Sequence, residues 1–191
     1  MGVLPRAGVS TSLADEVALH VAAATGGRTA SWRMELGCAL AGAVLLDLAL
    51  AGRVVVRPGQ LLINRPGPLE DPVQDEVLRR LAARWRAGSA EEWIERLAPL
   101  VRDRVLDGLV ARGLLFPEPG RWTVRLHPGA EREPVDPALS GTVARLLYAA
   151  HRRWAPAGRA ARADEPEAVT AVCAAVASCV LAATRRLICG Y

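Results

Sequence analysis

Lysine is absent from this 191-residue chain, so arginine alone balances its acidic side chains and gives a net charge of +4. The use of arginine alone suggests a GC-rich bacterial genome. Arginine alternates with aspartate and glutamate almost throughout, which is typical of a solvated surface of mixed charge. The basic balance leaves anionic partners open, either phospholipid headgroups or nucleic acid.

Aromatic residues are also scarce, at 4% of a chain that is 51% hydrophobic. The core must therefore be built from Ala, Leu and Val, which favours close packing of helices over a sheet sandwich. A chain of this length buries roughly 70% of its unfolded surface in one domain. We expect a mainly α, single-domain helical bundle over residues 11–191, preceded by a flexible lead at 1–10.

The motifs of metal sites and common enzymes are missing. The four cysteines form no CxxC pair and have no His close in sequence, which argues against a zinc site or a disulfide framework. No GxSxG, Walker or HExxH motif occurs. The sequence therefore predicts no enzyme, no metal and no cofactor. Because residues 1–30 lack the pattern of a signal peptide, we expect a cytoplasmic protein.

The most informative segment is a long apolar run from Trp32 to Arg53, predicted as a buried central helix. Glu35 and Asp47 bracket a stretch too short for a bilayer span, and Gly52 is a typical helix stop. A second uncharged run, 168–184, is rich in weakly hydrophobic alanine and is also predicted as a core helix.

Capping and turn signals divide the rest of the chain. Ser12 and Asp15 open a first helix, and Ser89 and Glu92 form a capping box for a short one. Proline at a first helical position marks other starts. The remaining expected elements are a hairpin at 53–64, a helix from Pro72, a separate helix from Pro99 to Gly113, a hairpin at 114–126, a helix from Pro137 to about Trp154 and a last helix from Pro166.

The order of these segments resembles the Golgi phosphoprotein 3-like family over residues 12–188, with the chain as a bacterial member. Its most specific parts are the ending Leu48–Arg53 and the pairing of Arg102-Asp103-Arg104 with Ala111–Leu114. The resemblance implies a mainly helical protein without enzymatic activity. It also implies binding of phosphatidylinositol 4-phosphate on a flat basic surface.

The resemblance places part of the family's headgroup site on this chain. Trp32 matches the tryptophan before the central helix, and Arg102 matches one of three arginines. The other two arginine positions fall on Ala41 and Pro99. Trp32 alternatively caps the core, and Arg102 alternatively forms a surface ion pair with Glu95 or a neighbour of Asp103.

Three other arginines, Arg28, Arg33 and Arg104, replace the missing pair if the fold brings them near Arg102. A phosphomonoester needs several charge-assisted donors, which arginine supplies as a fork. The N–H groups of the helix expected at Pro99 are a further source.

The hairpin 114–126 is the second candidate surface. By resemblance it projects and assists membrane contact and self-association, so Phe116, Arg121 and Trp122 are candidates for membrane insertion or a homo-oligomer contact. Alternatively, these aromatic side chains pack against the bundle.

A winged-helix DNA-binding module is the alternative function, with 99–113 as recognition helix and 114–126 as wing. Asp103 and Asp107 on that helix, and its lack of Asn, Gln and Lys, make nucleic acid the weaker partner. The sequence thus favours a non-enzymatic peripheral membrane protein that binds anionic phospholipid headgroups. Its particular lipid and its client proteins stay open.

Overall fold

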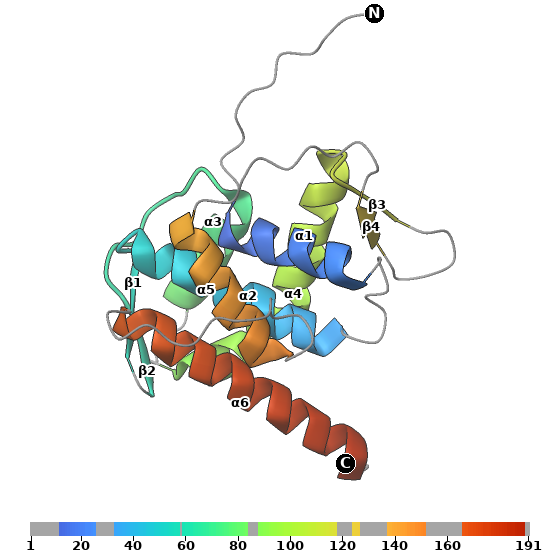
Figure 1. Ribbon diagram of the computed structural model, residues 1–191. Coiled ribbons are helices and arrows are strands. Elements are labelled where there is room, and N and C mark those ends of the chain that lie inside the picture. Colours follow the sequence, from blue (N-terminus) through green and yellow to red (C-terminus); the bar gives the residue numbers. More distant parts are fainter. Residues whose placement is uncertain are drawn as a thin grey trace, which may run out of the picture.

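Helix α2 (Arg33–Leu50) lies at the centre of the molecule, with α1, α4, α5 and α6 packed against it (Figure 1). The computed structural model describes residues 12–25, 33–57, 59–83, 88–117, 124–126, 137–151 and 166–189. The other elements are α1 (Leu13–Thr25), β1 (Val54–Arg57), β2 (Gln60–Ile63), α3 (Pro72–Ala82), α4 (Ala90–Ala111), β3 (Leu115–Pro117), β4 (Val124–Leu126), α5 (Pro137–Ala150) and α6 (Glu167–Cys189).

Two glycines let the neighbouring helices approach α2 closely. A Cβ atom on Gly37 would lie 3.0 Å from the Ala98 carbonyl oxygen of α4, and one on Gly42 would lie 2.6 Å from Val176 of α6. Eleven consecutive positions of α2, from Leu36 to Leu46, are buried, and so is Leu48. The predicted buried central helix is confirmed.

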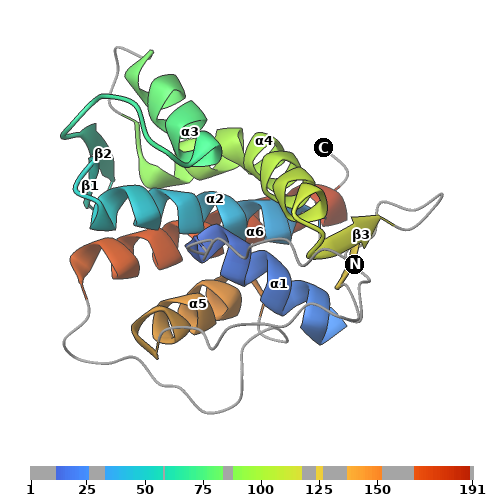
Figure 2. The same cartoon turned by 90° about the horizontal axis from the view of Figure 1, so that it is seen from above.

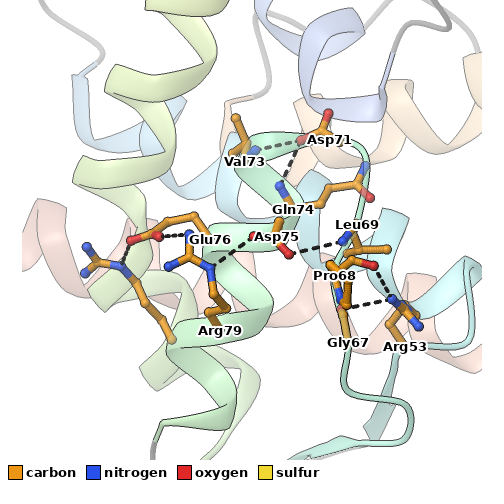
Figure 3. A network of polar contacts seen from close by, with 11 residues as sticks. Arg53, Gly67, Pro68, Leu69, Asp71, Val73, Gln74, Asp75, Glu76 and Arg79 are labelled. Carbon is orange, nitrogen blue, oxygen red and sulfur yellow. Dashed lines mark hydrogen bonds and ion pairs between the residues drawn. The ribbon is translucent and has the colours of Figure 1, made fainter.

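Helix α2 ends where its sequence predicts, and Arg53 fastens the segment that follows. Gly52 adopts φ +66°, a backbone conformation that favours glycine. The Arg53 N–H donates a hydrogen bond to the Leu48 carbonyl at a distance of 2.8 Å. The Arg53 guanidinium donates to the carbonyls of Gly67 and Pro68 at 3.0 and 2.9 Å (Figure 3). It therefore holds the chain between β2 and α3 against the end of α2.

Helix α3 begins at the cap that the sequence predicts. The Asp71 carboxylate accepts hydrogen bonds from the Val73 and Gln74 N–H groups, both at 2.8 Å (Figure 3). Asp75 accepts from the Leu69 N–H and pairs with Arg79, and these contacts hold its pKa below the ordinary value. The predicted hairpin before this helix is confirmed as β1 and β2, which pair antiparallel.

Helix α1 is capped twice at its N-terminus. Ser12 and Asp15 exchange hydrogen bonds of 3.1 and 3.4 Å, which confirms the predicted capping box. The Asp47 carboxylate of α2 also accepts from the Leu13 N–H at 3.1 Å. Burial, together with the negative charges of Asp71 and Asp15, raises the pKa of Asp47 to about 7 despite that hydrogen bond.

Helix α4 is one continuous helix, so the expectation of two helices is wrong. The Ser89 side chain caps it by accepting from the Glu92 N–H, as predicted, but the helix continues through Pro99 to Ala111. Proline costs the helix one backbone hydrogen bond. Burial of Ile94, Ala98 and Val101 against the bundle offsets that cost. No helix N-terminus exists at Pro99 to receive an anion.

Helix α6 is buried along one face only, which departs from the expected core helix. Val172, Val176 and Cys179 are buried, whereas Leu181 is 59% exposed. Over Glu167–Arg185, α6 is long and apolar enough to cross a membrane by length and composition, and it is the one such helix among the described residues. A third of that window is buried, so α6 contributes to the core through a single stripe.

Two buried thiols join α6 to α2 and α4. The Cys38 thiol hydrogen bonds to the Cys179 sulfur, and this contact and burial raise the pKa of Cys38. The Cys179 thiol in turn donates a hydrogen bond to the Glu91 carbonyl at a distance of 3.3 Å. Burial raises the pKa of Cys173 to about 11. These three cysteines are the small buried side chains that the sequence predicts, and the Cys189 side chain lies outside the described residues.

The second predicted hairpin is confirmed as β3 and β4, which pair antiparallel with Phe116 opposite Arg125. Strand β3 contacts α4, and β4 contacts α1. Both views place this hairpin at the end of the molecule away from β1 and β2 (Figures 1 and 2). Helix α5 ends at Ala150, four residues short of the expected Trp154, which is itself outside the described residues.

Candidate functional site

The candidate site lies where α4 crosses the N-terminal end of α2. Contact between Ala98 and Gly37 brings the two helix backbones together. One turn further along α4, Arg102 Nη1 donates to the Arg33 carbonyl at a distance of 3.5 Å. The fold thus places Arg102 beside the first residue of α2, which directly follows Trp32 in the sequence.

Arg102 is held in place from two sides. Its Nε and Nη2 atoms donate to Asp103 Oδ1 at 2.9 and 2.8 Å, while its Nη1 reaches the Arg33 carbonyl. The Arg102 side chain is 14% exposed and the Asp103 side chain 57% exposed. Arg102 therefore forms an ion pair, with Asp103 as its partner.

The N-terminal end of α2 adds positive potential and an apolar side chain. The first N–H groups of a helix have no partner within the helix and carry a partial positive charge. Arg33 is exposed at this end, and Met34 beside it is 43% exposed. Glu35, in the same first turn, is half-buried and contributes the opposing charge. The helix N-terminus and Arg33 therefore attract an anion, while Met34 can contact an apolar surface.

Arg104 does not join this cluster. It follows Arg102 by two residues on α4, so its side chain leaves the helix about 200° around the axis from the side chain of Arg102. Arg104 is exposed, whereas Arg102 faces α2. Of the candidate headgroup residues, the structure brings Arg102 and Arg33 together. Trp32 and Arg28 lie outside the described residues.

The two positions that carry arginine in the family pattern lie in different environments. Ala41 is completely buried in the middle of α2, where no arginine could reach solvent. Pro99 is exposed on α4, three residues before Arg102 and therefore on a neighbouring part of the helix surface. Position 99, unlike position 41, lies at the surface near Arg102.

The hairpin candidates are only partly described. Phe116 on β3 is 37% exposed, and its backbone pairs with Arg125. Arg121 and Trp122 lie outside the described residues, so the packing of the hairpin tip stays a prediction. Phe116 is nevertheless one of five large apolar side chains that are exposed in the described part of the chain.

Two arginines of the sequence motifs serve the fold, which the sequence alone does not reveal. Arg53 anchors the segment before α3, and Arg112 at the end of α4 pairs with Asp15 of α1 at 2.7 Å. The Asp15 side chain is 10% exposed, so this pair ties α1 to α4 across a largely buried contact. Arg53 and Arg112 therefore stabilise the architecture and do not belong to the candidate ligand site.

Among the described residues, no group of three or more His, Cys, Asp and Glu side chains is placed to hold a metal ion. A comparison with family models gives a match to Golgi phosphoprotein 3 (GPP34) over residues 13–186. The match covers every helix but the last three residues of α6. The expected resemblance is confirmed, and with it the mainly helical fold. The chain belongs to the Golgi phosphoprotein 3 (GPP34) family.

Proposed function

We propose that this protein binds anionic phospholipid headgroups at a membrane surface through Arg102 and the N-terminal end of α2. The observation that carries the proposal is the contact between the Arg102 guanidinium and the Arg33 carbonyl. It sets a fixed cation beside the N-terminal end of α2. Membership of the GPP34 family supports lipid-related binding in general. Phosphatidylinositol 4-phosphate is the specific headgroup that the resemblance implies.

The cluster suits a phosphate group on chemical grounds. Arginine presents planar donors that match phosphate oxygens, and its charge persists at every physiological pH. The partial positive charge at the start of a helix adds a further attraction for an anion. Met34, 43% exposed next to Arg33, offers apolar contact with the lipid beyond the headgroup. The role needs no chemical step, so we propose a binding protein rather than an enzyme.

A peripheral, cytoplasmic location follows from this role. The protein would reach the membrane by reversible contact of its α2 end, with the hairpin β3–β4 as a second contact or as the site of self-association. Exposure of Phe116 supports the second contact. Client proteins would be recruited to the same membrane surface, and their identity is a separate question.

Vesicle co-sedimentation tests the proposal. Phosphatidylcholine vesicles carrying phosphatidylinositol 4-phosphate are compared with vesicles of equal charge that carry phosphatidylserine. Substitution Arg102→Gln removes charge-assisted hydrogen bonds, so binding should weaken about tenfold. The matched control Arg104→Gln removes the same charge from the same helix and should change binding less than about twofold.

Two results would contradict the proposal. Equal losses in the two arginine variants would indicate general electrostatic attraction without a headgroup site. Binding to random duplex DNA that falls steeply with salt, in the absence of vesicle binding, would instead support the DNA-binding alternative.

A further inference from the structure

The donor edge of Arg102 is already occupied by a carboxylate of the same chain. Nε and Nη2, which together form one edge of the guanidinium fork, both donate to Asp103 Oδ1 at 2.9 and 2.8 Å. The remaining terminal nitrogen, Nη1, donates to the Arg33 carbonyl. A phosphate that binds Arg102 in the usual bidentate manner needs a complete edge of the fork. Asp103 occupies the edge of the Arg102 guanidinium that is formed by Nε and Nη2.

Helix geometry does not require this contact. Adjacent residues on a helix point about 100° apart and do not normally face each other. Arg102 lies toward α2 with 14% of its side chain exposed, whereas Asp103 is 57% exposed. The carboxylate can therefore swing into water while the guanidinium stays against α2. The pair is built so that the anion, and not the cation, leaves.

We propose that Asp103 is an internal competitor that occupies Arg102 in the free protein and is displaced by a phospholipid phosphate. The inference rests on the proposed function, since it concerns the same arginine. It assigns Asp103 a role opposite to that of a binding residue: it lowers the affinity for every anion that uses Arg102. Because the pair is exposed at its acidic side, the cost of displacing it corresponds to about two- to fivefold in affinity.

The chain offers a matched control for this inference. Asp107 is also exposed on α4, one turn beyond Asp103. Asp103→Asn and Asp107→Asn change the net charge equally and leave the size of the side chain unchanged. Only the first removes a carboxylate from Arg102. A difference between the two variants therefore reports the contact rather than the overall charge.

The experiment measures binding of the full chain to phosphatidylcholine vesicles that contain phosphatidylinositol 4-phosphate. We expect Asp103→Asn to bind about two- to fivefold more tightly than the unmodified protein. Asp107→Asn should bind within about 1.5-fold of it, because it takes no carboxylate away from Arg102 and exposed charges interact weakly through water. The double variant Arg102→Gln/Asp103→Asn should bind no more tightly than Arg102→Gln alone, because the competitor has nothing left to block.

The outcomes separate this inference from the proposed function. Weak binding of Arg102→Gln together with equal effects of the two aspartate variants would overturn the role of Asp103 and keep the lipid site. Weaker binding of Asp103→Asn would overturn it as well, since Asp103 would then orient Arg102 for its ligand. If Arg102→Gln binds as well as the unmodified protein, the proposed site itself is wrong and the inference falls with it.

Discussion

At the scale of single residues, the half-buried carboxylate of Asp47 carries a cost of desolvation. It caps α1 from within α2 and lies beside Asp15 and Asp71. A carboxylic acid needs no charge to accept a backbone N–H. The neutral form of Asp47 therefore satisfies the same hydrogen bond without the cost of burying a charge.

The raised pKa of Asp47 predicts a specific dependence of stability on pH. Its folded-state pKa of about 7 exceeds the ordinary value of 3.8, so folding favours the protonated form. The stability that this group contributes is complete below about pH 4 and is lost as the pH rises through 7. Asp47→Asn, which stays neutral, should be more stable than the unmodified protein at pH 8 by up to about 4 kcal/mol.

Urea unfolding of both proteins between pH 4 and pH 8 measures this effect. The difference in the free energy of unfolding should be small at pH 4 and should grow toward pH 8. Asp107→Asn, at an exposed position, serves as the control and should show a flat difference. A constant difference for Asp47→Asn would mean that Asp47 is ionised in the folded protein throughout this range.

At the scale of elements, caps could be predicted from sequence and tertiary contacts could not. Ser12 with Asp15, Asp71 and Ser89 each cap a helix where the residue pattern predicts it. Local hydrogen bonds join residues two or three apart, so the sequence contains them. Arg53 and Arg112, in contrast, bond to segments that lie 14 and 97 residues away. Nothing in their local sequence identifies those partners.

Pro99 shows why a local rule can fail. Proline is common at the first position of a helix, but α4 starts at the Ser89 cap and is already established when it reaches Pro99. The apolar residues on both sides of Pro99, among them Ala98 and Val101, are buried against the bundle. Tertiary packing thus keeps the helix intact through a residue that would break an isolated one.

Replacement of Pro99 by arginine should raise both the stability of the protein and its affinity for vesicles, and these two effects can be measured separately. Pro99→Arg restores a backbone N–H in the helix interior and should raise the free energy of unfolding by about 1 kcal/mol or more. It also places a second arginine one turn from Arg102, as in the family pattern. Vesicle binding through phosphatidylinositol 4-phosphate should then tighten by about tenfold.

Pro99→Ala is the control, because it restores the N–H without adding charge. It should share the gain in stability and leave vesicle binding unchanged. If the two variants bind equally, the surface beside position 99 does not contact the headgroup. Reduced stability of both would show instead that α4 is adapted to the proline.

At the scale of the whole molecule, the candidate membrane contacts gather toward one end. The start of α2 and the hairpin β3–β4 both point away from β1–β2 (Figures 1 and 2). Exposed Met34 and Phe116 lie on these two elements, while exposed Leu50 lies at the other end of α2. A protein that docks with the first end toward a bilayer would bring the basic site and the hairpin to the lipid together.

This orientation predicts opposite outcomes for two exposed apolar residues. Phe116→Ser removes a ring that would enter the lipid interface, and binding to anionic vesicles should weaken by about five- to thirtyfold, as expected for about 1–2 kcal/mol of apolar burial. Leu50→Ser removes a similar side chain from the far end and should leave binding unchanged. Leu50 is 56% exposed, so Leu50→Ser should change the free energy of unfolding by less than about 0.5 kcal/mol, whereas Phe116 is 37% exposed and Phe116→Ser should lower it by about 1 kcal/mol. Trp122→Ala, between β3 and β4 in the sequence, should weaken binding as Phe116→Ser does. If Leu50→Ser weakens binding as much as Phe116→Ser, the protein has no preferred orientation on the membrane, and the hairpin has no special part in docking.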